Sequence, residues 1–143
     1  MPFVDPARIA ISGCSYGGIQ TLLAGERDLG IKALVPFAPG AMSWEQNRPL
    51  QDRLIRAVDL AKAPVFLIQA ENDYSLGPSR VLSKEAKKKQ KNFQSRSIVA
   101  PQYTLDQPAF CRFGNSGGVL SGVENWWRPR KEGRKEGRKE IVR

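Results

Sequence analysis

The sequence predicts an α/β fold in which three to four parallel strands have flanking helices. Up to about residue 100, short apolar runs alternate with segments in which apolar residues recur every three or four positions. The run at 64–70 is almost continuously apolar, which is typical of a strand buried on both faces of a parallel sheet. Strands and helices that alternate at this spacing favour parallel pairing with helical crossovers.

The composition is that of one globular domain. The chain has 143 residues, of which 41% are hydrophobic, enough for one modest core. No apolar run approaches the ~20 residues that cross a membrane, and the first residues lack the basic and apolar segments of a secretory signal. We therefore expect a cytoplasmic protein with no membrane partner.

Two cysteines and the absence of histidine limit the chemistry of the chain. Cys14 and Cys111 form no CxxC pair, so we expect a reducing compartment or a buried free cysteine at Cys14, and no disulfide framework. Without histidine, two separated cysteines supply too few ligands for zinc. We expect no metal and no cofactor.

The pattern Gly-x-Ser-x-Gly lies at 13–17, between two predicted elements. The apolar run at 8–12 predicts a short, mostly buried strand, and the spacing over 16–24 predicts a helix that ends at Gly25. In the order strand, pattern and helix, Gly-x-Ser-x-Gly is typical of a nucleophile elbow, a sharp turn that projects a serine hydroxyl above the sheet. This context predicts that Ser15 is a nucleophile; the alternative is an ordinary glycine-rich turn.

The glycines around Ser15 have expected roles. Side chains two positions away on either side would obstruct the strained turn, so Gly13 and Gly17 are the expected elbow glycines. Gly18 is expected to let the helix pack close to the strand. The free N–H groups at the start of the helix favour negative charge that develops near Ser15.

Alternating strand and helix patterns continue beyond this turn. The expected elements are a strand at 31–38 that Pro36 and Pro39 end, a helix from 49 to about 61, the strand at 64–70, a loop at 71–75, a helix from about 78 to 91 and a short strand at 97–100.

Asp73 is the second candidate site residue. Ser15 follows the first expected strand and Asp73 follows the third, and the carboxyl ends of parallel strands meet at one edge of a sheet. Serine followed by aspartate, with histidine last, is the order of a hydrolase triad. We expect Asp73 on the same rim as Ser15, with a gap for an imidazole; the alternative is that Asp73 only caps the following turn.

Two segments resemble a known family. The sequences DPARIAISGCSYGG at 5–18 and APVFLIQAENDYSLGPS at 63–79 resemble the dienelactone hydrolase and prolyl-oligopeptidase-like branches of the α/β-hydrolases, and the likeness extends over about residues 2–96. The resemblance implies a partial α/β-hydrolase fold over residues 1–100, with the family's first strands before residue 1.

The same resemblance implies roles for three residues. Ser15 would be the nucleophile, Asp73 the acid that orients a histidine, and the backbone N–H of Tyr16 one oxyanion donor. Dienelactone hydrolases carry a cysteine nucleophile, whereas in this chain Cys14 precedes the serine. The implied activity is therefore that of a serine hydrolase acting on a small-molecule ester or a peptide.

The chain departs from this family at the histidine, because it has none. Without a base Ser15 is an ordinary alcohol, so we expect the chain by itself to be nearly inactive. The alternative function is a non-catalytic binding or interaction protein with a basic tail.

The positive charge is concentrated outside the expected core. Residues 128–143 hold eight Lys or Arg against three Glu, within a net charge of +9 for the whole chain. Glutamates interrupt these lysines and arginines, so we expect no nucleic-acid partner. The family-like pattern is lost near residue 97, and a charged four-residue repeat follows; we expect 101–143 to be an irregular tail, disordered or read out of frame.

Overall fold

The computed structural model describes residues 4–99, so the expectations for 101–143 lie outside the described residues. Within 4–99, no helix is long and apolar enough to cross a membrane. The elements are, in order, a 3-10 helix at Pro6–Arg8, β1 at Ala10–Cys14, α1 at Tyr16–Ala24, β2 at Ala33–Phe37, a 3-10 helix at Ala41–Ser43, α2 at Arg48–Leu60, β3 at Val65–Ala70, α3 at Gly77–Lys88 and β4 at Phe93–Ile98.

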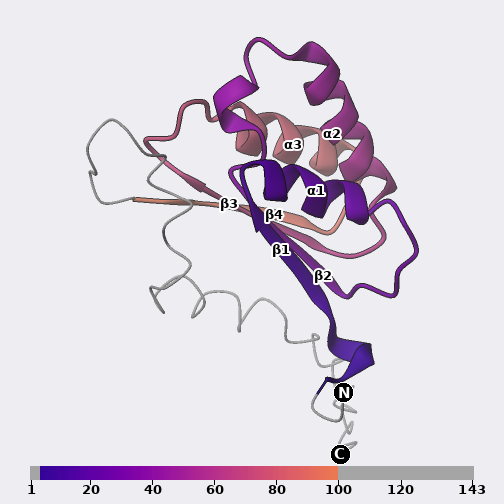
Figure 1. The fold of residues 1–143 in the computed structure, drawn as a ribbon. Coiled ribbons are helices and arrows are strands. Elements are labelled where there is room, and N and C mark those ends of the chain that lie inside the picture. Colours follow the sequence, from indigo (N-terminus) through magenta and orange to yellow (C-terminus); the bar gives the residue numbers. More distant parts are fainter. Residues whose placement is uncertain (1–3, 100–143) are drawn as a thin grey trace, which may run out of the picture.

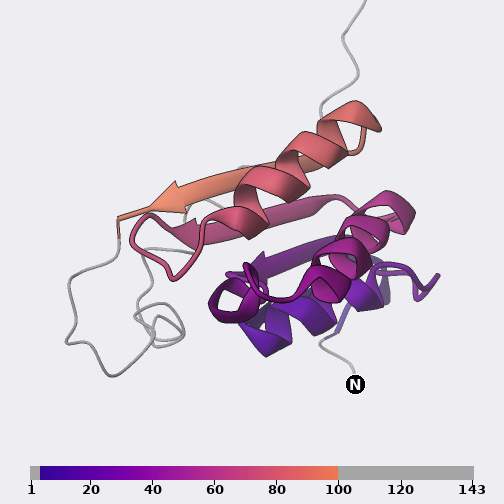
Figure 2. The same ribbon diagram turned by 90° about the horizontal axis from the view of Figure 1, so that it is seen from above.

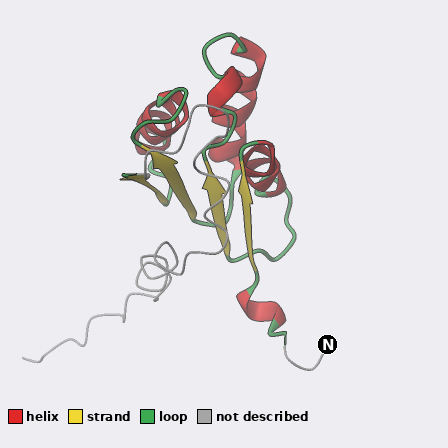
Figure 3. Ribbon diagram, turned by 60° about the vertical axis from the view of Figure 1, so that its left-hand side comes forward, coloured by secondary structure: helices red, strands yellow, loops and turns green. Residues whose placement is uncertain are grey.

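The four strands form one parallel sheet in the order β1-β2-β3-β4 (Figure 1). Viewed from above, the strands lie side by side (Figure 2). The prediction of an α/β fold with parallel strands and flanking helices is therefore confirmed. All three α-helices lie on one side of the sheet (Figure 3), because right-handed crossovers between strands that follow one another without a reversal stay on one face.

The helices and the sheet enclose the main apolar core. β3 is buried along its whole length, as its apolar run predicts. The second helix presents Leu54, Ala57 and Val58 to the sheet. The fully buried leucines of this core are Leu22, Leu34, Leu54, Leu67 and Leu82.

β1 differs from its prediction in position and burial. It runs from Ala10 to Cys14, not from 8 to 12, and its first residue is exposed. The reason is that β1 is an edge of the described sheet and pairs only with β2. Of the two alternating isoleucines, Ile11 is half-buried against the core, whereas Ile9 precedes the strand and is exposed.

Pro36 lies inside β2, so the prediction that it helps to end the strand is wrong. Leu34 donates its N–H to Pro64 O at 3.0 Å, and Ala38 donates to Ile68 O at 3.0 Å. Pro36 sits between these two donors and has no N–H of its own, and the β2–β3 register is correspondingly interrupted. The ladder to β1 is complete, because Pro36 does not need to donate on that side.

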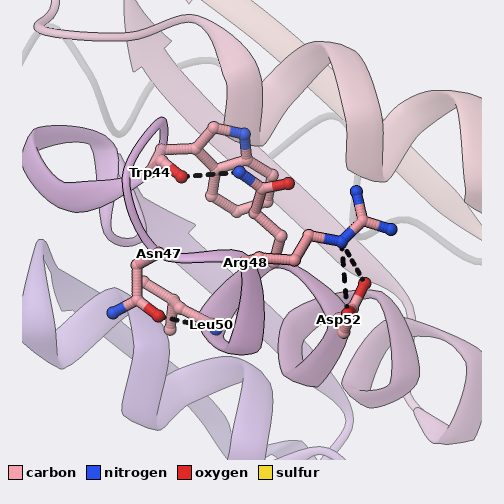
Figure 4. Close-up of polar contacts among 6 residues, drawn as sticks. Trp44, Asn47, Arg48, Leu50 and Asp52 are labelled. Carbon is pink, nitrogen blue, oxygen red and sulfur yellow. Dashed lines mark hydrogen bonds and ion pairs between the residues drawn. The ribbon is translucent and has the colours of Figure 1, made fainter.

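The second helix begins at Arg48, one residue before the predicted start. The Asn47 side chain accepts a hydrogen bond from Leu50 N at 3.0 Å, and Arg48 forms an ion pair with Asp52 at 3.1 Å (Figure 4). A side-chain cap thus fixes the start of α2.

β4 begins four residues before its predicted start at 97. Its four central residues are polar and exposed, so no apolar run marks them. Backbone pairing with β3, from Val65↔Phe93 to Ala70↔Ile98, holds this strand in place.

Candidate functional site

Ser15 sits on a strained turn between β1 and α1. Its φ of 53° and ψ of −110° are angles that a residue with a side chain rarely adopts. Its N–H donates to Phe37 O at 2.9 Å, and its carbonyl accepts from Ile19 N at 3.1 Å. The Ser15 side chain does not cap the helix, so the hydroxyl is left for other chemistry.

The space around the turn explains two of its glycines. A Cβ on Gly13 would lie 2.5 Å from the carbonyl carbon of Gly17, and a Cβ on Gly18 would lie 2.7 Å from Phe37 O. A Cβ on Gly17 would meet nothing within 4 Å. The turn therefore excludes a side chain at Gly13 and Gly18. The backbone of Gly17 is what a side chain at Gly13 would strike, but Gly17 itself has room for a Cβ, contrary to the steric reason expected for this glycine.

The first turn of α1 presents backbone donors beside Ser15. The N–H of Tyr16 belongs to this first turn and has no intrahelical acceptor. Tyr16 as a whole residue is 71% exposed. The arrangement can hold negative charge next to the serine, because N–H groups and the helix dipole both favour it.

Asp73 lies in the loop after β3 and is fixed by hydrogen bonds. Its Oδ1 accepts from Tyr74 N at 2.8 Å, and its Oδ2 accepts from Gln69 Nε2 at 3.0 Å. Its own N–H donates to Ala70 O at 3.3 Å. The carboxylate is bound by the backbone of its own loop and by one side chain from β3.

Gln69 is a residue of this site that the sequence reasoning missed. It is fully buried in β3 and binds both Asp73 and the start of α3. The signal was available, since Gln69 is the one polar residue in the strand VFLIQA. A polar residue inside an apolar run that must be buried requires partners, and those of Gln69 lie at the carboxyl end of the strand.

A second link joins the loop after β2 to the loop after β3. The Ser75 hydroxyl donates to Glu45 and accepts from Gly77 N at 2.8 Å. Trp44 is 2% exposed and lies where a Cβ on Gly77 would have to be. The loop that carries Asp73 is thereby packed against the segment before α2.

Ser15 and Asp73 leave the sheet at the same edge, because β1 and β3 are parallel and both loops follow carboxyl ends. One strand, β2, lies between them, which separates the two strands by two spacings, or ~10 Å. Backbone strain also collects at this edge, where Ala38 after β2 has a φ of 44°.

Other polar features of the described residues lie away from this edge. A hydrogen bond from Arg53 lowers the pKa of Glu26, and one from Lys62 lowers the pKa of Asp28; both carboxylates follow α1, at the opposite end of the strands.

A hollow of about 270 Å³ lies between α2 and α3, and one of about 420 Å³ lies between α3 and β4.

Two further expectations concern cysteine and metal chemistry. Among the described residues Cys14 is not a free cysteine, so the prediction of a free thiol beside Ser15 is wrong. Within residues 4–99, no group of three or more His, Cys, Asp or Glu side chains is placed to hold a metal ion.

Comparison with known proteins identifies the fold. No family model matches the sequence, and no curated protein matches it. Among solved structures, the uncomplexed acylaminoacyl peptidase of Pyrococcus horikoshii has a TM-score of 0.63 and 21% identity, over 93% of this chain and 26% of that one. Porphyromonas gingivalis dipeptidyl peptidase 4 has a TM-score of 0.60 and 18% identity, over 88% and 20%.

A puromycin-hydrolysing peptidase of Mycobacterium tuberculosis has a TM-score of 0.57 and 21% identity, over 68% of this chain and 19% of that one. This chain thus spans about a fifth to a quarter of the length of these peptidases. At such identities the likeness establishes the fold, which is part of an α/β-hydrolase fold.

Proposed function

We propose that the chain carries two members of a serine-hydrolase triad, Ser15 as the nucleophile and Asp73 as the acid that supports a histidine-type base. The observation that carries the proposal is the backbone of Ser15, a non-glycine residue with φ 53° at the turn between a strand and a helix. Such strain persists only where the surrounding structure enforces it, and it collects at functional sites. An ordinary glycine-rich turn would place a glycine at that position.

The proposed chemistry is acyl transfer from an ester or a peptide. The Ser15 oxygen attacks the carbonyl carbon while its proton passes to an imidazole, and the Tyr16 N–H stabilises the oxyanion of the tetrahedral intermediate. The imidazolium returns the proton to the departing alcohol or amine, and water then releases the acyl group by the same route. The likeness to peptidases supports peptide substrates, and the resemblance of 5–18 and 63–79 to dienelactone hydrolases supports small-molecule esters.

The imidazole of this mechanism has to be supplied by another molecule, because this chain has no histidine. Removal of one triad member leaves only ~10³–10⁴-fold enhancement over water in known serine hydrolases. We therefore expect the isolated chain to be nearly inactive and to respond to added imidazole.

A fluorophosphonate probe with and without imidazole tests the proposal. Displacement of fluoride by the Ser15 oxygen requires transfer of the serine proton, so imidazole should accelerate labelling of the peptide that contains Ser15. Ser15→Ala is expected to abolish this labelling, and intact mass should show one adduct. No adduct at Ser15 even with imidazole would overturn the proposal.

The absence of histidine also favours a second candidate function, a non-catalytic binding or interaction protein on the same fold. This candidate predicts that Ser15 stays unlabelled at every imidazole concentration. The same experiment therefore separates the two functions.

A further inference from the structure

Gln69 is the best-connected polar side chain near the proposed site. It is fully buried, and it is the one polar residue of β3, whose other residues are all apolar. Burial of an amide without partners costs free energy, so its hydrogen bonds need to be complete. Among residues 4–99, no buried side-chain nitrogen or oxygen lacks a partner.

Each end of the Gln69 amide has a defined task. Its Nε2 donates to Asp73 Oδ2 at 3.0 Å and to Ser75 O at 2.6 Å. Its Oε1 accepts from Ser79 N at 3.1 Å. A flipped amide would place oxygen against a carboxylate and a carbonyl and would place nitrogen against an N–H, so only one orientation satisfies all three contacts.

These contacts close the Asp73 loop at both of its ends. Ser79 N belongs to the first turn of α3, where helix N–H groups lack intrahelical acceptors. Gln69 satisfies this N–H from the strand that precedes the loop and binds the carboxylate in the middle of the loop with its other end. The position of the Asp73 carboxylate is thereby tied to the sheet and to α3.

We propose that Gln69 is a positioning residue that fixes the Asp73 carboxylate for an imidazole placed between Asp73 and Ser15. The inference rests on the proposed function and names the side chain that acts through Asp73. A carboxylate accepts about four hydrogen bonds, and the Gln69 amide and the Tyr74 N–H donate two of them. These two hydrogen bonds restrain the carboxylate, and its other acceptor positions remain for a further donor because Asp73 is only half-buried.

The test is the imidazole dependence of fluorophosphonate labelling at Ser15 in full-length variants. Gln69→Leu removes all three contacts, and Gln69→Glu keeps the acceptor for Ser79 but turns an oxygen toward Asp73. Both should raise the imidazole concentration for half-maximal labelling about tenfold or more, because small misplacements of a supporting group weaken catalysis strongly. Ser83→Ala is the control, because the Ser83 hydroxyl bonds to the Ser95 hydroxyl and touches neither Gln69 nor Asp73, and it should change the value less than about twofold.

A double-variant comparison separates positioning from general structural damage. If Gln69 acts through Asp73, Gln69→Leu should add less than about twofold in an Asp73→Asn background. An equal loss in both backgrounds would overturn the proposal, as would unchanged imidazole dependence in a folded Gln69→Leu or Gln69→Glu variant. If neither variant folds, a crystal structure of the unchanged protein decides. A Gln69 amide that does not bind Asp73 would overturn the proposal, whereas the three contacts of Gln69 to Asp73, Ser75 and Ser79 would support it.

Failure of the proposed function gives a different result. In that case imidazole does not accelerate labelling of the unchanged protein, or Asp73→Asn leaves the acceleration intact. The proposed role of Gln69 is then wrong as well. If the imidazole response depends on Asp73 but not on Gln69, only the proposed role of Gln69 is wrong, and the proposed roles of Ser15 and Asp73 stand.

Discussion

The Ser15 turn and the Asp73 loop leave the same edge of the sheet but are held by different forces. Backbone sterics shape the first: Ser15 has a positive φ, its side chain makes no capping bond, and a side chain at Gly13 would strike the backbone of Gly17. Side-chain hydrogen bonds shape the second, with Gln69 at its centre.

This difference means that opposite kinds of substitution disrupt the two regions. We expect the turn to be disrupted by one added methyl group at Gly13 or Gly18. We expect the loop to be disrupted by the loss of a buried donor or acceptor, such as the Gln69 amide. Substitutions that exploit this contrast test each half of the site separately.

The largest effect is expected for Gly13→Ala. The new Cβ would lie 2.5 Å from the carbonyl carbon of Gly17, and its nearest neighbours are all backbone atoms of Gly17, which cannot swing aside as a flexible side chain would. We expect the free energy of unfolding to fall by about 3 kcal/mol or more. Chemical denaturation measures the change.

Gly17→Ala is the matched control for that substitution. A Cβ on Gly17 meets nothing within 4 Å, and this residue is helical. Replacement of a helical glycine by alanine should leave stability unchanged or raise it by about 0.5–1 kcal/mol. Equal losses for Gly13→Ala and Gly17→Ala would contradict a steric origin of the turn.

Gln69→Leu is expected to cost about 2–4 kcal/mol of unfolding free energy. The substitution preserves volume but leaves Ser79 N and Ser75 O without their partner, and each such buried group costs about 1–3 kcal/mol. Urea denaturation of the variant gives the value. A loss below about 0.5 kcal/mol, the size expected for an exposed substitution, would show that water replaces the amide and that the loop is not held from the strand.

A smaller effect is expected for Ser75→Ala. The Ser75 hydroxyl binds Gly77 N at the start of α3 and also Glu45, so its loss should cost about 1–2 kcal/mol. Ser83→Ala is a suitable comparison, since the Ser83 hydroxyl binds only the exposed Ser95 hydroxyl at 2.8 Å. The thermal midpoints of the two variants should differ, with Ser83→Ala close to the unchanged protein.

The same contrast explains how much of the molecule the sequence could predict. Glycine spacing and apolar periodicity are local signals, and they located the Ser15 turn, α1 and β3 almost to the residue. The hydrogen bonds of Gln69 to Asp73 and Ser79 depend on how the loop folds back, which no local pattern encodes. β4 was placed too late because an exposed edge strand is held by its backbone pairing and needs no apolar run.

The smallest predicted effect lies at the opposite end of the strands. The hydrogen bond from Arg53 lowers the pKa of Glu26 below its ordinary value of 4.5 in the folded protein. This carboxylate therefore contributes stability that is complete above about pH 4.5 and is lost as the pH falls through the folded value.

Glu26→Gln should therefore lower the unfolding free energy slightly at pH 7, and the difference from the unchanged protein should shrink in acid. Denaturation curves at pH 7 and pH 3 measure this. Because the pair is partly exposed, salt should weaken the effect at pH 7 as well. A difference that grows in acid would contradict the sign, and neither outcome should alter labelling at Ser15.

The most direct test of the account is whether Asp73 controls what imidazole does at Ser15. The measurement is the rate of fluorophosphonate labelling at Ser15 against imidazole concentration in the unchanged protein, in Asp73→Asn and in Asp59→Asn, where Asp59 is a carboxylate on α2 near Lys89. We expect Asp73→Asn to weaken the imidazole response about tenfold or more and Asp59→Asn to leave it unchanged. Identical responses in the two variants would show that Ser15 and Asp73 do not share a site.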